Sequence, residues 1–143
     1  MADTTDVSGL VRRVTTQDFV PLHQITGDQR EQGSVATLIS REFGGSTDIM
    51  LGLARFGPGE SRRPHHHPNA SEAYVVLRGE VVIHVGGDDV SASYGTAVYV
   101  PPNTVHSIRN DSDQPAEVLW AFNHPERSDH GLVYDDHVWP ELA

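Results

Sequence analysis

The chain has 143 residues, of which 37% are hydrophobic and 21% charged, a composition typical of a soluble globular protein. Acidic residues outnumber Lys and Arg by 20 to 10, and no basic stretch is long enough to follow a phosphate backbone, so we expect no nucleic-acid partner. The absence of cysteine excludes disulfides, thiolate metal ligands and a cysteine nucleophile.

The N-terminal stretch MADTTDVSGLVRRVTTQDF lacks the apolar segment of a signal peptide, and no window approaches the apolar run that a membrane span needs. These features predict a soluble, cytoplasmic protein with no membrane partner. The length suits one domain. We expect residues 1–10, which are small, polar and acidic, to be flexible, and residues 11–143 to form a single domain.

Next in the chain, residues 16–32 are ambiguous and could contain a short helical turn. From there on, runs of strand-forming residues recur about every ten residues, with Gly, Pro, Asn and Asp between them. This pattern is typical of an all-β sandwich or barrel. GPGE and GGDD are expected to be turns. The predicted strands are 34–40, 48–56, a hairpin over 72–85 that turns at Arg78-Gly79, 96–101, 105–110 and 117–123.

The core of the predicted domain covers residues 48–123, and residues 124–143 form a polar tail that could pack over a barrel mouth or against a neighbouring subunit. The segments VVL and VVI in the central strands are apolar on both strand faces. A strand with one wet face would alternate, so we expect a second sheet on one face and another subunit on the other. This pattern predicts a homodimer.

Three consecutive histidines stand in the segment PHHHPNASE. Residues two apart in a strand point to the same side, so His65 and His67 can face inward together while His66 faces outward. Glu72 follows at an odd offset, which a bulge or turn at the intervening Pro-Asn pair can reset. His106, at the start of a later strand, is the best candidate for a third imidazole. A solvated histidine run remains the alternative interpretation.

A set of three imidazoles and one carboxylate suits Fe(II), Mn(II), Ni(II), Co(II) or Zn(II), and does not suit calcium or Cu(I). We therefore expect one divalent transition metal ion per chain, with the identity of the metal left open. Four protein ligands leave two positions on a six-coordinate ion. A chelating substrate, or a substrate oxygen beside dioxygen, could occupy them.

The spacing of the residues around His65, His67, Glu72 and His106 resembles the two sequence motifs of the cupin superfamily, which follow one another in the same order in this chain. In the first, Gly59 is followed after five residues by His65, after one by His67, after four by Glu72 and after six by Gly79. The motifs and their linker cover residues 59–110, and the flanking strand pattern fits the rest of the fold.

In the second motif, Gly95 is followed after five residues by Pro101, and His106 and Asn110 stand at the remaining defining positions. The usual glycine of this motif is replaced by Asn103. Asn is the residue other than glycine that best tolerates a positive φ, so the turn is expected to form in spite of the substitution.

The resemblance implies a six- to eight-stranded antiparallel jelly-roll barrel, or double-stranded β-helix, with a metal at the bottom of a funnel. It maps the metal ligands onto His65, His67, Glu72 and His106, and implies a homodimer that acts on a small molecule. Cupins include dioxygenases, decarboxylases, isomerases, cyclases and lyases, and also ligand-sensing domains, so the fold does not fix the reaction. Residues 38–60 are also loosely similar to the corresponding run of cupins that cyclise bacterial polyketides.

Our first hypothesis is a metal-dependent enzyme that isomerises or cyclises a small oxygenated, enolisable metabolite through Lewis-acid chemistry. Proton transfer would fall to Tyr74, Glu72 or a water on the metal, since Tyr74 shares the inward face with Glu72. One alternative is an Fe(II)-dependent dioxygenase of a diketone or aromatic diol. Another is a non-catalytic small-molecule-binding cupin, which the absence of a helix-turn-helix pattern and of a basic patch disfavours.

Other residues are assigned weaker roles. Three apolar residues could line the cavity, although core packing is the simpler interpretation: Met50, Phe56 and Trp120. Arg62 and Arg63 could pair with an anionic substrate, but solvated surface positions are favoured. Four histidines have no spacing that assigns them to the site: His84, His124, His130 and His137. Of these, His124 and His130 could reach the mouth of the barrel, but only if the tail folds over it.

Overall fold

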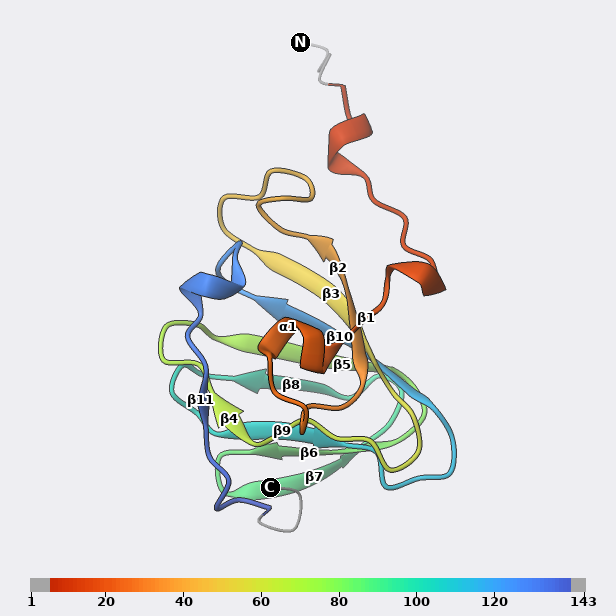
Figure 1. Ribbon diagram of the computed structural model, residues 1–143, viewed down its shortest axis with the longest axis vertical. Coiled ribbons are helices and arrows are strands. Elements are labelled where there is room, and N and C mark those ends of the chain that lie inside the picture. Colours follow the sequence, from red (N-terminus) through yellow and green to blue (C-terminus); the bar gives the residue numbers. More distant parts are fainter. Residues whose placement is uncertain (1–5, 140–143) are drawn as a thin grey trace.

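The computed structural model describes residues 6–139. It contains two antiparallel sheets, one of six strands in the order β1-β2-β3-β10-β5-β8 and one of five strands in the order β11-β4-β9-β6-β7 (Figure 1). The strands are β1 Val20–Pro21, β2 Ser34–Ile39, β3 Met50–Phe56, β4 His65–His66, β5 Glu72–Arg78, β6 Val81–Val85, β7 Asp88–Ala92, β8 Ala97–Val100, β9 His106–Arg109, β10 Ala116–Phe122 and β11 Val133–Tyr134. The predicted all-β class is confirmed.

Helical structure among the described residues is short. The helical turn anticipated within residues 16–32 is present as the 3-10 helix η2, Thr16–Asp18, and the α-helix α1, Leu22–Thr26. Two further 3-10 helices are η1, Ser8–Leu10, and η3, Arg127–Asp129. No helix of residues 6–139 is both long and apolar enough to cross a membrane. The predicted flexibility of residues 1–10 concerns a stretch whose first five residues lie outside the described part of the chain.

The predicted hairpin over residues 72–85 is wrong. β5 lies between β10 and β8 in one sheet, whereas β6 lies between β9 and β7 in the other. Between them Gly79 has a φ of 74°, and a Cβ there would lie 2.5 Å from the Pro115 carbonyl oxygen. The chain therefore crosses from one sheet to the other at a position where only glycine fits. The hairpin instead joins β6 to β7, so Asp88 and Asp89, expected in a turn, belong to a strand.

The inward-facing side chains of the two sheets form the hydrophobic core. Along β3 and β10 every second residue is buried, as expected when one face of a strand meets the opposite sheet. Met50, Phe56 and Trp120 are all buried in this layer. The core positions of β10 are Ala116, Val118, Trp120 and Phe122.

The indole of Trp120 occupies space that a glycine leaves open. Trp120 is in register with Gly52 of β3 and with Tyr74 of β5. A Cβ on Gly52 would lie 2.2 Å from Cζ2 of Trp120 and 2.4 Å from the Ala36 carbonyl oxygen. A larger residue at position 52 would displace the indole, so this glycine shapes the interior beside the site described below.

The tail folds back onto the segment that carries the three histidines. β11 pairs with β4 in antiparallel register, with Tyr134 opposite His65 and Val133 opposite His66 (Figure 1). The Asp136 carboxylate accepts hydrogen bonds from the Arg63 guanidinium, at 2.7 Å from Nη2. The tail is therefore joined to the first motif by backbone pairing and by an ion pair, and it lies over one end of the barrel.

Candidate metal centre

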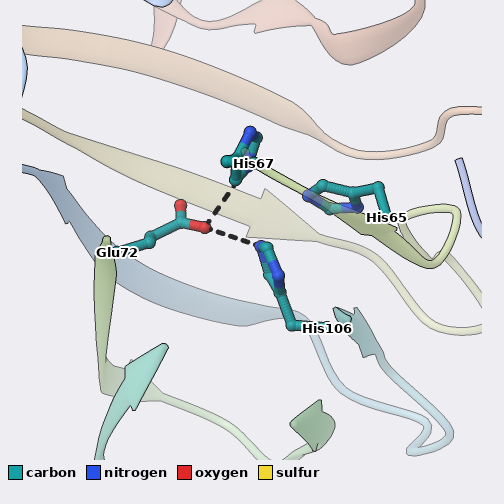
Figure 2. A group of neighbouring side chains, drawn as sticks. All are labelled: His65, His67, Glu72 and His106. Carbon is teal, nitrogen blue, oxygen red and sulfur yellow. Dashed lines mark hydrogen bonds and ion pairs between the residues drawn. The ribbon is translucent and has the colours of Figure 1, made fainter. Parts of the chain in front are cut away.

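Four side chains that the spacing singled out converge in the interior. His65 lies on β4, His67 just after it, Glu72 at the start of β5 and His106 at the start of β9 (Figure 2). All four are buried, and one potential ligand atom from each lies within 4.8 Å of the others. The cluster fits a single metal ion.

The backbone arranges this convergence as strand parity predicts. His65 and His67 face inward, whereas His66 points away and its Nδ1 lies 2.7 Å from Oδ2 of Asp135 in the tail. A turn at Pro68 and Asn69 separates His67 from β5, which brings Glu72 to the same side in spite of its odd offset. The imidazole that we placed outside the site therefore contacts the tail.

Asn103 has a φ of 61°, the conformation anticipated for the residue that replaces the usual glycine. Its backbone N–H donates to the His67 carbonyl oxygen over 3.0 Å. The turn before His106 is therefore attached directly to the segment that carries the other two histidines, which fixes the two motifs relative to each other.

The Nδ1 atom of each inward histidine lies next to a backbone carbonyl oxygen. The distances are 2.6 Å from His65 to Arg63, 2.6 Å from His67 to Gly131 and 2.8 Å from His106 to Thr104. A carbonyl oxygen only accepts, so each Nδ1 carries the hydrogen and donates it. In neutral His65 and His67 the lone pair is therefore on Nε2, which points into the cluster. Nε2 of His106 faces the Glu72 carboxylate, which only accepts, so in the metal-free chain this nitrogen donates to it.

None of these Nε2 atoms has a hydrogen-bond donor beside it in the described part of the chain. Those of His65 and His67 are buried without a hydrogen-bond partner. Nε2 of His106 lies 2.9 Å from Oε1 of Glu72, and Nε2 of His67 lies 3.7 Å from the same oxygen. Buried acceptors without donors are costly, and a central cation would satisfy all of them. The donor set therefore fits a divalent transition metal, whose neighbouring ligand atoms lie about 3 Å apart.

Electrostatics favour the protonation states that ligation requires. Burial, with the nearby charge of Arg62, lowers the pKa of His65 well below its usual value. Burial also lowers the pKa of His67 to about 4. For Glu72, burial raises the pKa, but the hydrogen bond and charge of His106 outweigh it, so the pKa lies below the usual value. At neutral pH the two imidazoles are neutral and the carboxylate is ionised, as metal ligands are.

Tyr74 is buried beside the carboxylate. Its hydroxyl donates to Oε1 of Glu72 over 2.9 Å. Burial, together with the negative charge of Glu72, raises the pKa of Tyr74 well above its usual value. The phenol therefore keeps its proton at neutral pH and acts as a hydrogen-bond donor that orients Glu72.

A cavity of about 220 Å³ opens from the cluster. His67, Glu72 and Tyr74 are at its polar end. The remaining walls are mostly apolar, and Phe56 and Trp120 belong to them, whereas Met50 lies in the core and not among the lining residues. A cavity of about 150 Å³ holds benzene, so this one has room for one substituted ring. The other apolar lining residues are Leu22, Ile25, Val35, Ala54, Ile108, Phe122 and Leu132.

Arg62 and Arg63 are not solvated, contrary to expectation. Nε of Arg62 lies 2.6 Å from Oε2 of Glu31, and the guanidinium also lines the cavity. Arg63 is 4% exposed and pairs with Asp28 and Asp136. The acidic partners stand far away in the sequence, and the local pattern of residues does not reveal such pairs.

The tail supplies residues to the cavity that the sequence did not assign to it. Arg127, His130 and Leu132 all line it. The His130 ring is stacked on Phe122 with ring centres 4.0 Å apart, and it lies 6.1 Å from the His67 ring. Of these three residues, only His130 was expected to be able to reach the mouth of the barrel, on the condition that the tail folds over it. That condition is met.

Two of the histidines left outside the site remain outside it. Nδ1 of His84, on β6, lies 2.7 Å from Oδ1 of Asp89, and the His84 ring packs against Trp139 of the tail. His137 is exposed. His124 is half-buried and contributes its carbonyl oxygen, 3.1 Å from Nε2 of His130.

Residues 52–122 match the family described as the cupin domain. The tetracenomycin polyketide synthase protein TcmJ of Streptomyces glaucescens is 28% identical over 104 residues, which cover 73% of this chain and 70% of the relative. The β-D-galactosidase Rv1717 of Mycobacterium tuberculosis is 31% identical over 106 residues, covering 73% and 84% of the two chains.

Among solved structures, a predicted oxalate decarboxylase from Thermotoga maritima aligns with a TM-score of 0.60 and 28% identity, covering 65% of this chain and 81% of that one. The three relatives are named for different activities, so the likeness establishes ancestry and fold and leaves the reaction open. The two motifs, the two-sheet barrel and the match to the cupin domain agree with one another. The chain belongs to the cupin superfamily.

Proposed function

We propose that His65, His67, Glu72 and His106 hold one divalent transition metal ion, and that the protein is an enzyme acting on a small oxygenated, enolisable metabolite. The observation that carries this proposal is the pair of buried, unpartnered Nε2 atoms beside an ionised carboxylate at the end of a ring-sized cavity. A metal ion at this place would supply the electrophilic centre that isomerisation or cyclisation of a carbonyl compound requires.

The proposed chemistry assigns separate roles to the metal and to the chain. When bound, the ion would polarise a substrate oxygen and so lower the pKa of an adjacent C–H group. The apolar walls exclude water from the substrate. We propose that the ionised Glu72 carboxylate accepts the proton that leaves the C–H group and that Tyr74, which lines the cavity and keeps its proton, donates a proton to the product. The hydrogen bond between the two side chains would pass the proton from Glu72 back to Tyr74.

The comparisons support a reaction of this kind without naming it. TcmJ is a polyketide synthase protein, and the Thermotoga relative is a predicted oxalate decarboxylase, so both are named for the chemistry of small oxygenated molecules. A cavity of about 220 Å³ encloses about one ring. A longer polyketide would therefore extend out of the mouth, and a single-ring or short-chain substrate fits the enclosed part better.

The test is a turnover screen of β-dicarbonyl, catechol and keto-acid compounds with protein reconstituted with Zn, Ni, Mn or Fe. Each reaction is run in air and under argon, with His67→Ala as the control that removes a proposed ligand. We expect turnover that survives argon and disappears in the control. Turnover with iron and oxygen alone would identify a dioxygenase. Tight metal binding and ligand binding without turnover of any compound would identify a binding protein.

We further propose that the protein is a homodimer that pairs through the outer face of the six-stranded sheet. Leu119 of β10 lies in register between Leu53 of β3 and Val75 of β5, and all three side chains are partly exposed on that face. Tyr99, on the neighbouring β8, is 64% exposed. A continuous apolar face of this kind is typical of a protein–protein interface.

A further inference from the structure

The cavity contains a cation with no anionic partner. Arg127, at the start of η3 in the tail, lines the cavity, and its Cζ lies 4.9 Å from the centre of the Trp120 ring. Its Nη2 is buried and has no hydrogen-bond partner. Within residues 6–139, no carboxylate lies within ion-pair distance of this guanidinium. Guanidinium nitrogens are strong donors, so an unused one in the interior points to a group that is not among the described residues.

The second arginine of the cavity differs in this respect. Arg62 is neutralised by Glu31, whose Oε2 lies 2.6 Å from its Nε. Burial, together with the charge of Arg62, lowers the pKa of Arg127 to about 10, so Arg127 is still protonated at neutral pH. The metal cluster contributes its own ionised carboxylate, Glu72, but that group faces the histidines. The guanidinium of Arg127 is therefore left without an ion pair among the described residues, in a cavity whose walls are mostly apolar.

We propose that the substrate is a monocarboxylate whose carboxylate is bound by Arg127, while its apolar body lies against Trp120 and Phe122. This inference rests on the proposed function, since it places the other end of the substrate at the metal cluster. A planar guanidinium fork matches a carboxylate, and the single unpaired guanidinium matches one carboxylate group at that end of the cavity. The cavity volume of about 220 Å³ limits the body to about one ring, so an aromatic monocarboxylate is the expected class.

The test measures binding of three simple probes to the zinc-loaded protein: benzoate, its neutral analogue benzamide, and phenyl phosphate. Calorimetry gives the affinity, and the fluorescence of Trp120, which contacts Arg127, reports occupancy of the cavity. The variants are Arg127→Gln, which removes the charge, and Arg127→Lys, which keeps the charge but loses the fork. Arg109→Gln is the matched control, because Arg109 also lies over a tryptophan, Trp139, outside the cavity.

We expect Arg127→Gln to weaken benzoate binding at least about tenfold, Arg127→Lys to weaken it less, and Arg109→Gln to leave it unchanged. Benzamide binding should not change in any variant. Equal benzoate affinity in wild type and Arg127→Gln, no benzoate binding by wild type, or tighter binding of phenyl phosphate would each overturn the proposal. The zinc content of every sample separates this result from the proposed function. Wild-type protein that takes up no zinc would contradict the metal site, and the comparison of benzoate affinities in metal-free protein would still test Arg127.

Discussion

The hydroxyl of Tyr74 donates a hydrogen bond to Oε1 of Glu72 over 2.9 Å, in a place where neither side chain meets bulk water. The two residues lie two apart on β5, so strand parity directs both to the interior. Nε2 of His106 lies 2.9 Å from the same carboxylate oxygen. The phenol therefore fixes the orientation of the proposed oxygen ligand towards the histidines.

Tyr74→Phe should weaken metal binding about 10- to 100-fold, because it removes the hydrogen bond that orients Glu72 and leaves all four proposed ligands in place. The fold should be unaffected, since the ring remains. Competition with a chelator of known affinity measures the change. Tyr94→Phe is the control, because Tyr94 is 80% exposed. Equal metal affinity in Tyr74→Phe and wild type would show that this hydrogen bond has no influence on the site.

Gly52→Ala should lower the free energy of unfolding by about 1–3 kcal/mol, because the added methyl group would meet the Trp120 ring and a rigid backbone carbonyl at once. Trp120 must move, so its fluorescence should shift as well. Gly87→Ala is the matched control, since a Cβ there meets nothing within 4 Å, and its effect should stay within about 0.5 kcal/mol. Urea denaturation measures both variants. Equal stability of the two would mean that the backbone at Gly52 yields easily.

The metal-free protein should lose stability as the pH falls from 7 to 5. The pKa of His67 is about 4 in the folded chain, lowered by burial from its ordinary value of 6.5. Below pH 6.5 the unfolded chain therefore binds more protons, which lowers the free energy of unfolding by up to about 1.4 kcal/mol per pH unit for each such histidine. His65, whose pKa burial also lowers, acts in the same direction.

His67→Gln should accordingly flatten this pH dependence by up to one proton, as measured by urea denaturation of metal-free protein at several pH values. His137→Gln changes an exposed histidine and serves as the control. If the slopes of wild type and His67→Gln coincide between pH 7 and 5, His67 does not have the lowered pKa on which the ligand assignment draws.

The local part of the site could be predicted from the sequence. Strand parity separates His66 from its neighbours, and fixed spacing within each motif places Glu72 and His106, because both depend on the geometry of a few adjacent residues. The positive φ of Asn103, at 61°, follows in the same way from the conformational preference of one residue in a turn.

The long-range part could not be predicted. A glycine with positive φ is needed both in a hairpin and at a corner between sheets, so the pattern around Gly79 does not distinguish the two. The pairing of Arg62 with Glu31 depends on the fold of the segment before β2. Arg127 reaches the cavity only because the tail folds back onto β4, and backbone pairing of that kind leaves no periodic signal in two-residue strands such as β11.

Leu119→Lys should convert the proposed homodimer into a monomer, because it places a charge at the centre of the apolar outer face. Sedimentation at micromolar concentration should give about twice the chain mass for the wild type and the chain mass for the variant. Ser91→Lys, at an exposed position of β7 on the other sheet, should remain a dimer. A monomeric wild type would leave the partly exposed Leu53, Leu119 and Val75 without a partner.

The metal content of two neighbouring alanine variants tests the central claim most directly. His66→Ala removes an imidazole that contacts Asp135, and His67→Ala removes one whose Nε2 is buried without a partner. Both proteins are expressed without a tag and analysed for Fe, Mn, Ni, Co and Zn beside the wild type. We predict one ion per chain in the wild type and in His66→Ala, and loss of the ion in His67→Ala. Equal metal content in the two variants, or a wild type that binds none of these metals even after reconstitution, would contradict the assignment.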